Sequence, residues 1–359
     1  MLIRSQNVRM NELTLRDVAY VTEEIHAGMN RSKVRNGDVL LNITGASIGR
    51  VVCFEMDGVT ANVNQHVCII RSKPDGFFPR YLTHLISSPE FQSEIDRLQH
   101  GGTRQALTFS QISEFKIPLP PLAEQRRIAE VLDRAEALRA KRRAALAQLD
   151  SLTQSLFLDL FGDPVSNHKG WPRQKFSEVG TLDRGISKNR PRNAPELLGG
   201  PYPLVQTGDV ANCNGYIRKY QSTYSEIGLR QSKMWPTGTL LITIAANIAK
   251  TGILTFNSCF PDSIVGFRAE DSATVEFVRS WHSFLQKSLE DAAPESAQKN
   301  INLALLRNLV VPVPPIELQR EFARRVTAVE TLKTAHRASL AELDALFATL
   351  QHRAFRGEL

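Results

Sequence analysis

Cysteine is scarce in this chain, and the few cysteines follow no metal-binding or disulfide pattern. The 359 residues contain four, with no CxxC pair and no histidine at ligand spacing: Cys53, Cys68, Cys213 and Cys259. Structural zinc sites and the disulfide frameworks of small secreted proteins need closely spaced pairs. We therefore expect reduced thiols and no bound metal.

Long apolar runs are also missing. The most apolar stretch, Leu240 to Ile248, is too short to span a bilayer as a helix. The first residues, MLIRSQNVRM, carry no apolar core of signal-peptide length. These two absences predict a cytoplasmic protein.

The sequence has none of the common motifs for nucleotide binding or amino-methyl transfer. It contains no GxxxxGK(S/T) loop, no GxGxxG and no Asn/Asp-Pro-Pro-aromatic tetrad. We therefore expect no catalytic residues, no cofactor and no activity of its own in this chain.

The composition is otherwise that of an ordinary globular protein with a basic balance. Apolar residues make up 42% and charged residues 23%, and 44 Lys and Arg against 37 Asp and Glu give a net charge of +7. The length suits two domains with real cores. The positive charge favours a polyanionic partner such as DNA.

An internal repeat dominates the organisation of the chain. The segment from Pro118 to Phe161 aligns without a gap with the segment from Pro312 to Phe355, and both carry the pattern Pro-x-Pro-Pro followed by Gln-Arg. The similarity continues upstream, where Gly37-Asp38-Val39-Leu40 matches Gly238-Thr239-Leu240-Leu241. A period of this length indicates a duplicated domain and not a solenoid.

Each half has a mixed pattern ahead of its proline cluster. Short β-rich runs stand at Val39–Ile43, Val67–Ile70, Thr239–Ile244 and Ile253–Phe256, between Gly and Asn residues, whereas Pro79–Leu98 and Thr274–Leu289 have helical character. These runs predict two α+β domains.

After each proline cluster the chain has strong helix formers and no Gly or Pro for about 40 residues, which gives a rod of roughly 60 Å. Pro121 and Pro315 suit the first turn, with Glu124 and Glu317 close to the positive helix end. Apolar and small residues alternate in steps of three and four, as in a coiled-coil seam. The predicted seams are Ile128, Val131, Ala135, Leu138, Arg142, Ala145, Leu149, Leu152 and Leu156, and Phe322, Arg325, Val329, Leu332, His336, Ser339, Leu343, Leu346 and Leu350.

Both seams are weak in the middle and apolar at the ends. Arg142 and Ala145 lie in the middle of the first seam, and His336 and Ser339 in the middle of the second. An antiparallel pair brings the two weak middles together and fixes the register. The predicted fold is therefore α+β, with two globular domains separated by two long helices that form an antiparallel coiled coil.

With its two variable domains, each closed by IPLPPLAEQRRIA or VPVPPIELQREFA at the start of a long helix, the chain resembles the specificity subunit of type I restriction-modification enzymes. Further matching stretches are Gly37–Leu40 with Thr44-Gly45, Asn64-Gln65-His66, Leu241 to Ile248, and Cys259-Phe260-Pro261-Asp262-Ser263. The resemblance covers nearly the whole chain.

The resemblance implies a non-catalytic subunit whose two target-recognition domains each bind one half of a bipartite DNA sequence. It also implies partners: two methyltransferase subunits that use S-adenosylmethionine to methylate adenine, and motor-nuclease subunits that use ATP and magnesium.

The implied domains are 1–117 for the first recognition domain, 118–161 for the first helix, 162–311 for the second recognition domain and 312–359 for the second helix. Leu2 aligns with Leu204, although about 32 residues from Trp171 onward precede Leu204 in the second half. We therefore expect the first recognition domain to lack its opening segment.

DNA contacts are expected from Arg and Lys at phosphates and from Arg, Asn, Gln, Ser and Thr at base edges. The basic stretch Arg184–Asn193 and two polar segments ahead of the proline clusters are the main candidates. The candidates are Arg4, Gln6, Arg50, Thr103, Arg104, Gln105, Arg184, Lys188, Arg190, Arg192, Gln206, Thr207, Asn247, Lys250, Gln298, Lys299 and Asn300.

Two alternatives stay open at this point. Pro74-Asp75 with Glu114-Phe115-Lys116 imitates a PD-ExK motif, although the related Arg307-Asn308-Leu309 of the second half carries no acid or lysine. The chain could thus be a stand-alone PD-ExK-like nuclease, which would cut DNA with magnesium alone. It could also be a helical scaffold that binds protein but not DNA, which absent or salt-insensitive DNA binding would reveal.

Overall fold

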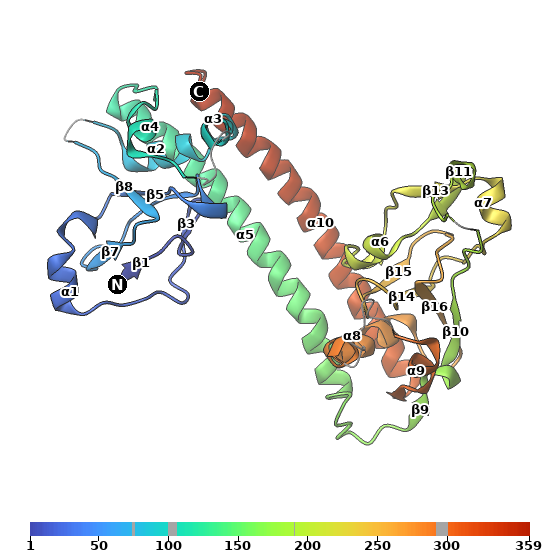
Figure 1. Ribbon diagram of the computed structural model, residues 1–359. Coiled ribbons are helices and arrows are strands. Elements are labelled where there is room, and N and C mark those ends of the chain that lie inside the picture. Colours follow the sequence, from blue (N-terminus) through green and yellow to red (C-terminus); the bar gives the residue numbers. More distant parts are fainter. Residues whose placement is uncertain (74–75, 100–105, 190, 292–300) are drawn as a thin grey trace. The chain divides into compact units, whose positions relative to one another are not determined.

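The computed structural model describes residues 1–73, 76–99, 106–189, 191–291 and 301–359. The chain divides into two compact units: the first comprises Met1–Ala145 and His336–Leu359, and the second comprises Leu146–Ala335. Helices α5 (Leu122–Phe161) and α10 (Ile316–Ala354) each contribute to both units (Figure 1). Each unit therefore combines one globular domain with a part of each long helix.

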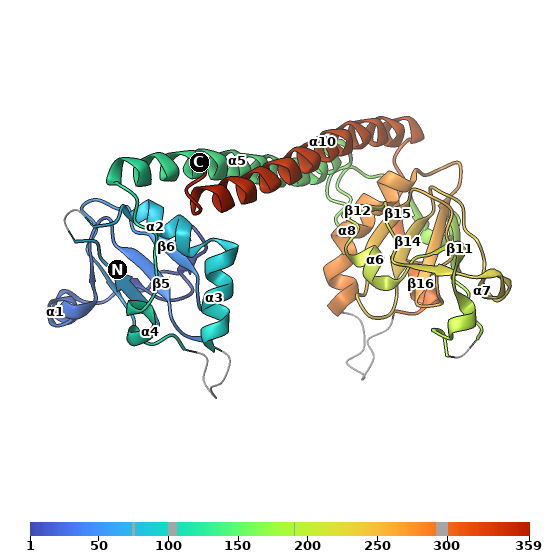
Figure 2. The same cartoon turned by 90° about the horizontal axis from the view of Figure 1, so that it is seen from above.

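The described residues of the first unit form three small sheets and a layer of helices. Its sheets have the strand orders β6-β5-β8, β1-β7-β4 and β2-β3. Helix α2 packs against β5 and β6 (Figure 2). The elements are β1 (Leu2–Ile3), β2 (Val8–Arg9), β3 (Glu12–Leu13), α1 (Glu23–Gly28), β4 (Lys33–Val34), β5 (Val39–Asn42), β6 (Val51–Cys53), β7 (Ala61–Val63), β8 (Val67–Ile70), α2 (Pro79–Ile86), α3 (Pro89–Gln99) and α4 (Phe109–Ser113).

The second unit is built around a five-stranded sheet of order β10-β16-β14-β15-β12, with the strand pairs β11-β13 and β17-β9 beside it. Phe277 and Trp281 of α8 join Phe322 of α10 in the core over this sheet. The elements are β9 (Arg173–Lys175), β10 (Gly180–Arg184), β11 (Leu198–Leu204), α6 (Thr207–Ala211), β12 (Gly215–Ile217), β13 (Ser222–Tyr224), α7 (Glu226–Arg230), β14 (Leu240–Thr243), β15 (Thr251–Leu254), β16 (Ile264–Ala269), α8 (Val275–Asp291), α9 (Leu303–Asn308) and β17 (Val310–Pro312). Short 3-10 turns lie at Asn30–Ser32, Gly45–Ser47, Phe176–Glu178 and Pro195–Leu197.

The duplication recurs in the main-chain hydrogen bonds of the two sheets. The N–H of Ile43 donates to the carbonyl of His66 over 3.0 Å, and the N–H of Ile244 donates to that of Ser263 over the same distance. The N–H of Asn42 bonds to Arg50 and that of Thr243 bonds to Lys250, over 2.8 and 2.9 Å. Strands β5, β6 and β8 therefore correspond to β14, β15 and β16, and Arg50 corresponds to Lys250.

The two central sheets differ at both edges: in the second unit β12 pairs with β15, whereas among the described residues β6 of the first unit pairs with β5 alone. In the second unit, β10 pairs antiparallel with the outer edge of β16. In the part of the first unit that the structure describes, β8 pairs with β5 alone, so its other edge carries no strand. Strand β10 belongs to residues 171–203, for which the sequence alignment gives the first half no counterpart.

The predicted elements are correct in kind and inexact at their ends. Strand β8 occupies the predicted range, whereas the last strand predicted in the second half lies two residues earlier, at Thr251–Leu254. The helical character predicted for Pro79–Leu98 is confirmed, and the segment forms two helices, α2 and α3, with a break ahead of Pro89. A proline lacks the N–H that would continue the first helix.

Two buried glutamines fasten the long helices to their domains. Gln319 accepts a hydrogen bond from the Thr274 N–H over 3.0 Å and donates to the carbonyls of Pro314 and Ser272 over 2.9 and 3.0 Å. Gln125 accepts from the Phe78 N–H over 2.7 Å and donates to the Pro120 carbonyl over 2.8 Å. The repeated Pro-Pro and Gln pattern is therefore a clamp at the start of each helix.

The helix starts differ slightly from the prediction. Pro121 precedes the first helical residue, Leu122, and its carbonyl accepts the N–H of Gln125. The prediction that Pro121 and Pro315 lie inside the first turn is therefore wrong by one residue, because each supplies the first acceptor instead. Glu124 and Glu317 do stand in the first turns, where a negative charge is favourable.

Every second position of the predicted seams is one residue off. Leu138 and Leu332 are each 52% exposed, whereas the next residues, Arg139 and Lys333, are largely buried. The seam of α5 runs through Ile128, Leu132, Ala135, Arg139, Arg142, Leu146, Leu149, Thr153 and Leu156, with equivalent positions in α10. Steps of three and four leave the choice between adjacent positions open, and at Leu138/Arg139 and Leu332/Lys333 the more apolar residue was the wrong choice.

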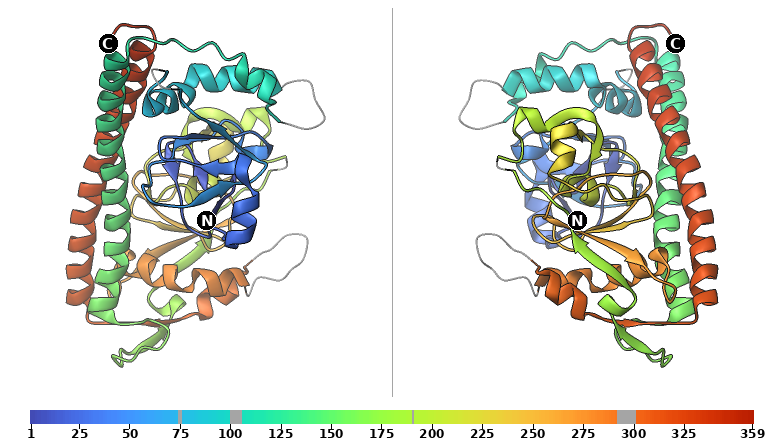
Figure 3. Two further views of the ribbon diagram at one scale, coloured as in Figure 1. Left: turned by 90° about the vertical axis from the view of Figure 1, so that its left-hand side faces the viewer. Right: turned by 90° about the vertical axis from the view of Figure 1, so that its right-hand side faces the viewer.

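The antiparallel pairing of the helices is confirmed within each unit (Figure 3). In the first unit, Arg139 contacts Asp344 over 2.6 Å, and the guanidinium of Arg142 contacts Nδ1 of His336 over 2.8 Å. In the second unit, Lys333 pairs with Asp150 over 2.9 Å. The polar middles of the two seams therefore meet, as the sequence predicts.

Candidate nucleic-acid interface

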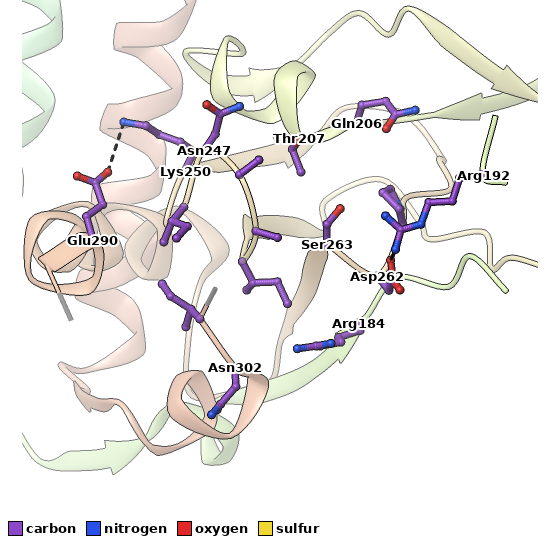
Figure 4. A pocket seen from close by; sticks show the side chains of 16 residues that line it. Arg184, Arg192, Gln206, Thr207, Asn247, Lys250, Asp262, Ser263, Glu290 and Asn302 are labelled. Atoms are coloured by element: carbon purple, nitrogen blue, oxygen red, sulfur yellow. Dashed lines mark hydrogen bonds and ion pairs between the residues drawn. The ribbon is translucent and has the colours of Figure 1, made fainter. Parts of the chain in front are cut away.

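An open hollow of about 990 Å³ lies beside the loop between β14 and β15 in the second unit. We call it the β14–β15 hollow, and Figure 4 shows its side chains. They come from β10, the loop after it, the start of α6, the β14–β15 loop, the turn before β16 and the ends of α8 and α9. The lining residues are Arg184, Arg192, Gln206, Thr207, Ile244, Ala245, Ala246, Asn247, Ile248, Lys250, Pro261, Asp262, Ser263, Glu290, Ile301 and Asn302.

The β14–β15 loop holds two alanines in a left-handed conformation. Ala246 has φ 51° and Ala249 has φ 59°, whereas the corresponding loop of the first unit has Gly45 and Gly49 with φ 72° and 83°. An alanine in this region is strained by about 1–2 kcal/mol because its Cβ approaches the following carbonyl. The buried Thr243 hydroxyl compensates by donating to the Asn247 carbonyl and accepting from the Lys250 N–H. The loop is therefore strained and firmly held, which is common where a loop presents a side chain.

The loop presents one amide and one ammonium group to the hollow. Asn247 is exposed and Lys250 is half-exposed at the rim (Figure 4). Gln206 and Thr207 extend from the start of α6 on the adjacent side. Amides and hydroxyls at such positions can donate to and accept from base edges, whereas the cations suit phosphates.

Two of the cations in the hollow are paired with acids. Arg192 contacts Asp262 over 2.5 Å, and Lys250 contacts Glu290 over 3.7 Å. Arg184, the last residue of β10, is exposed and makes no ion pair with an acid among the described residues. Among the described residues, the hollow therefore has one solvent-exposed guanidinium, that of Arg184, and two cations that contact carboxylates, Arg192 and Lys250.

The structure brings six of the sequence candidates together in this hollow: Arg184, Arg192, Gln206, Thr207, Asn247 and Lys250. Lys188 lies outside it, and its main-chain N–H donates to the buried Gln231 over 2.6 Å. Gln231 thus anchors the basic stretch, a role that no feature of the sequence indicated.

Three of the described candidates belong to the first unit. Arg50 is exposed at the position that corresponds to Lys250, and Gln6 is exposed in the turn after β1. Arg4 is half-buried and donates to the Asp17 carbonyl over 2.7 Å, which ties down a loop. The remaining candidates lie outside the described residues: Thr103, Arg104, Gln105, Arg190, Gln298, Lys299 and Asn300.

Sequence reasoning missed the two acids that line the hollow, Asp262 and Glu290, and the helix-capping residue Asn302. Asp262 and Ser263 stand in a stretch that carried the family resemblance, which was a usable signal. Glu290, near the end of α8, gave no signal. Asn302 caps α9 by accepting the Leu305 N–H over 2.7 Å.

Other chemistry finds little support in the described part of the chain. No group of three or more His, Cys, Asp or Glu residues there could hold a metal ion. Burial raises the pKa of the Cys53 thiol to about 12 and that of Cys68 to about 11, so neither is a reactive thiolate. Pro74 and Asp75 of the PD-ExK alternative lie outside the described residues. No described helix is both long and apolar enough to cross a membrane.

Comparison with known proteins places the chain in one family. The model of the type I restriction modification DNA specificity domain matches residues 7–148 and 168–345. The specificity subunit of the Escherichia coli type I enzyme EcoBI is 26% identical, over 90% of this chain and 73% of that protein. The EcoKI specificity subunit of Escherichia coli K12 is 21% identical, over 100% of this chain and 82% of that protein.

Solved structures show the same fold. The type I restriction-modification S subunit from M. genitalium aligns with a TM-score of 0.59 at 16% identity, covering 91% of this chain and 84% of that one. A chain from a study of complex assembly and conformational transition in a type I system aligns with a TM-score of 0.56 at 21% identity, covering 100% and 91%. Because the family model covers both halves, the chain belongs to the type I restriction-modification specificity family and is the DNA specificity subunit of such a system.

Proposed function

We propose that each globular domain binds one half of a bipartite DNA target and that the β14–β15 hollow is the reading surface of the second domain. The proposal rests on one observation: Arg184, Gln206 and Asn247 line the same hollow together with the cations Arg192 and Lys250. The strained β14–β15 loop carries Asn247 and Lys250, and neighbouring elements carry the other three. Domain boundaries near residues 117, 161 and 311 belong to the same proposal.

The side chains divide into two roles. Asn247 and Gln206 carry amides that suit the N6 and N7 edge of adenine, and Arg184 suits the O6 and N7 edge of guanine. Lys250 and Arg192 suit phosphates, which position a protein without reading sequence. In the first domain, Arg50 takes the place of Lys250 at the corresponding loop end.

The partners in this proposal are two copies of a methyltransferase subunit, together with motor-nuclease subunits. Support for two equal copies comes from exposed leucines that the duplication repeats on the long helices. Leu138 and Leu346 lie in the first unit, 52% and 49% exposed, and Leu152 and Leu332 lie in the second, 40% and 52% exposed. Of this repeated set, each unit offers one leucine from α5 and one from α10 to an apolar partner surface, and Leu158 of α5 is a further exposed leucine in the second unit.

The partners would supply the chemistry. S-adenosylmethionine for adenine methylation belongs to the methyltransferase subunits, and ATP with magnesium belongs to the motor-nuclease subunits. The specificity subunit then directs methylation or restriction to its target in the cytoplasm, as a defence against foreign DNA.

The test is binding of the full chain, assembled with its methyltransferase subunits, to duplexes that carry the target or single-base changes in it. Asn247→Ala and Arg184→Ala should each reduce discrimination at one base pair by about 1–3 kcal/mol. Asn308→Ala, which alters an exposed asparagine of α9 outside the hollow, is the control. Unchanged discrimination in both test variants would remove the hollow from the reading surface.

A further inference from the structure

The two ion pairs of the hollow join elements that are far apart in sequence. Arg192, in the loop after β10, contacts Asp262 before β16, and Lys250, at the end of the β14–β15 loop, contacts Glu290 on α8 (Figure 4). All four side chains remain between 35% and 45% exposed. Ion pairs that are this exposed contribute little to stability, so stability does not account for their place at the rim.

A carboxylate that is paired with a phosphate-binding cation weakens the binding of that cation to DNA phosphates. The phosphate must displace the carboxylate, and the carboxylate repels the phosphate while it stays. Since nonspecific binding depends almost entirely on cation–phosphate attraction, the pairs weaken nonspecific binding. Binding to the correct target adds base contacts, whose energy can displace the carboxylates.

We infer that Asp262 and Glu290 are specificity-determining residues. They hold Arg192 and Lys250 in ion pairs whose carboxylates are displaced more readily by the phosphates of the correct target than by those of nonspecific DNA. They act through the two cations and are therefore positioning residues. This inference rests on the proposed reading surface.

The first unit supports a role in specificity and not in folding. Its Arg50 corresponds to Lys250 and makes no ion pair with an acid among the described residues. The residue that corresponds to Asp262 is the neutral Gln65, because Ser263 corresponds to His66. Strands β5, β6 and β8 and the loop between β5 and β6 thus take the corresponding arrangement without either pair.

The experiment removes the two negative charges and keeps the shape. The variant Asp262→Asn/Glu290→Gln is assembled with the methyltransferase subunits and bound to a fluorescent duplex of unrelated sequence between 50 and 200 mM salt. The matched control is Glu270→Gln/Asp271→Asn, which changes the net charge equally at two exposed acids outside the hollow.

The test variant should bind unrelated DNA more tightly and with a steeper salt dependence. Two freed cations steepen the slope of log affinity against log salt by up to about 1.8, which over this fourfold salt range is about a twelvefold larger loss of affinity. The ratio of target to unrelated binding should fall. The control should change neither the slope nor the ratio.

Two outcomes would overturn the inference, and a third would overturn the reading surface itself. If the double variant binds the target less tightly and unrelated DNA no more tightly, the acids read bases directly, as carboxylates do at cytosine N4. If the variant matches the control while Lys250→Ala weakens binding, the acids play no part in specificity. If Lys250→Ala, Arg192→Ala and the double variant all leave DNA binding unchanged, the hollow does not face DNA.

Discussion

The glutamine clamp offers a test of how the helices are fixed to their domains. Gln319→Met keeps the size of the side chain and removes three hydrogen bonds, which leaves the Thr274 N–H and the Pro314 and Ser272 carbonyls without this partner. Each lost bond of this kind costs about 1 kcal/mol, so the second unit should lose about 3 kcal/mol of unfolding free energy. Gln125→Met removes two bonds and should cost about 2 kcal/mol in the first unit.

Urea unfolding followed by tryptophan fluorescence measures the first of these values. All three tryptophans, Trp171, Trp235 and Trp281, belong to the second unit, so the signal reports that unit. Native-state amide exchange of helix α2, next to Phe78, measures the second value. Gln148→Met, on an exposed face of α5 in the second unit, is the control and should be neutral. A loss below about 0.5 kcal/mol for Gln319→Met would show that the buried bonds do not hold the helix.

The remaining predictions concern the strained loop, a buried histidine and the length of the long helices. Ala246→Gly/Ala249→Gly relieves two left-handed alanines and should raise the melting temperature while loosening target discrimination; equal stability would mean that the loop is not strained. His282 is fully buried, neither of its ring nitrogens has a hydrogen-bond partner among the described residues, and burial lowers its pKa to about 4. Because the unfolded chain binds this proton at a higher pH than the folded one, stability should fall as the pH drops below about 6.5, by about 2 kcal/mol at pH 5. His282→Met should abolish this part of the pH dependence, and a curve like that of the unaltered protein would exclude His282 as its source. If the long helices set the distance between the two half-sites, their length sets the number of unspecified base pairs, the spacer, between those half-sites. Adding seven residues after Ala140 and after Thr334 keeps the seam in phase and lengthens each helix by about 10 Å, so the spacer should grow by about three base pairs. An unchanged spacer in an active complex would show that helix length does not set it.

The fold was predictable where local pattern and global packing agree. The paired proline clusters and the uninterrupted helix formers identified both long helices, and the polar residues Arg142 and His336 identified the antiparallel register. The phase of the seam was not predictable, because Leu138 is more apolar than Arg139 and yet stays exposed. Arg139 is buried because its guanidinium contacts Asp344 and lies over the Phe347 ring, and both partners come from the other helix.

The candidate site was predictable by residue type and not by placement. Arg184, Gln206 and Asn247 lie far apart in sequence, and the hollow collects them because β10, α6 and the β14–β15 loop meet at one end of the sheet. Asp262 and Glu290 were missed because the sequence does not show which cation an acid will contact. The fold brings each of them next to a cation that lies far away in the sequence. Gln231 was missed for the same reason, since its bonds reach the main chain of Lys188 and Asn189.

Mapping of methylated bases across the host genome tests the central claim most directly. The measurement compares the host, a strain without this gene, and strains that carry either the unaltered gene or Arg184→Ala/Asn247→Ala. The account predicts that one bipartite methylated motif disappears on deletion and returns with the unaltered gene. The double variant should relax the bases of one half of that motif and leave the other half as it was. A methylation pattern that survives deletion, or a variant that changes both halves alike, would contradict the assignment of the hollow to half of the target.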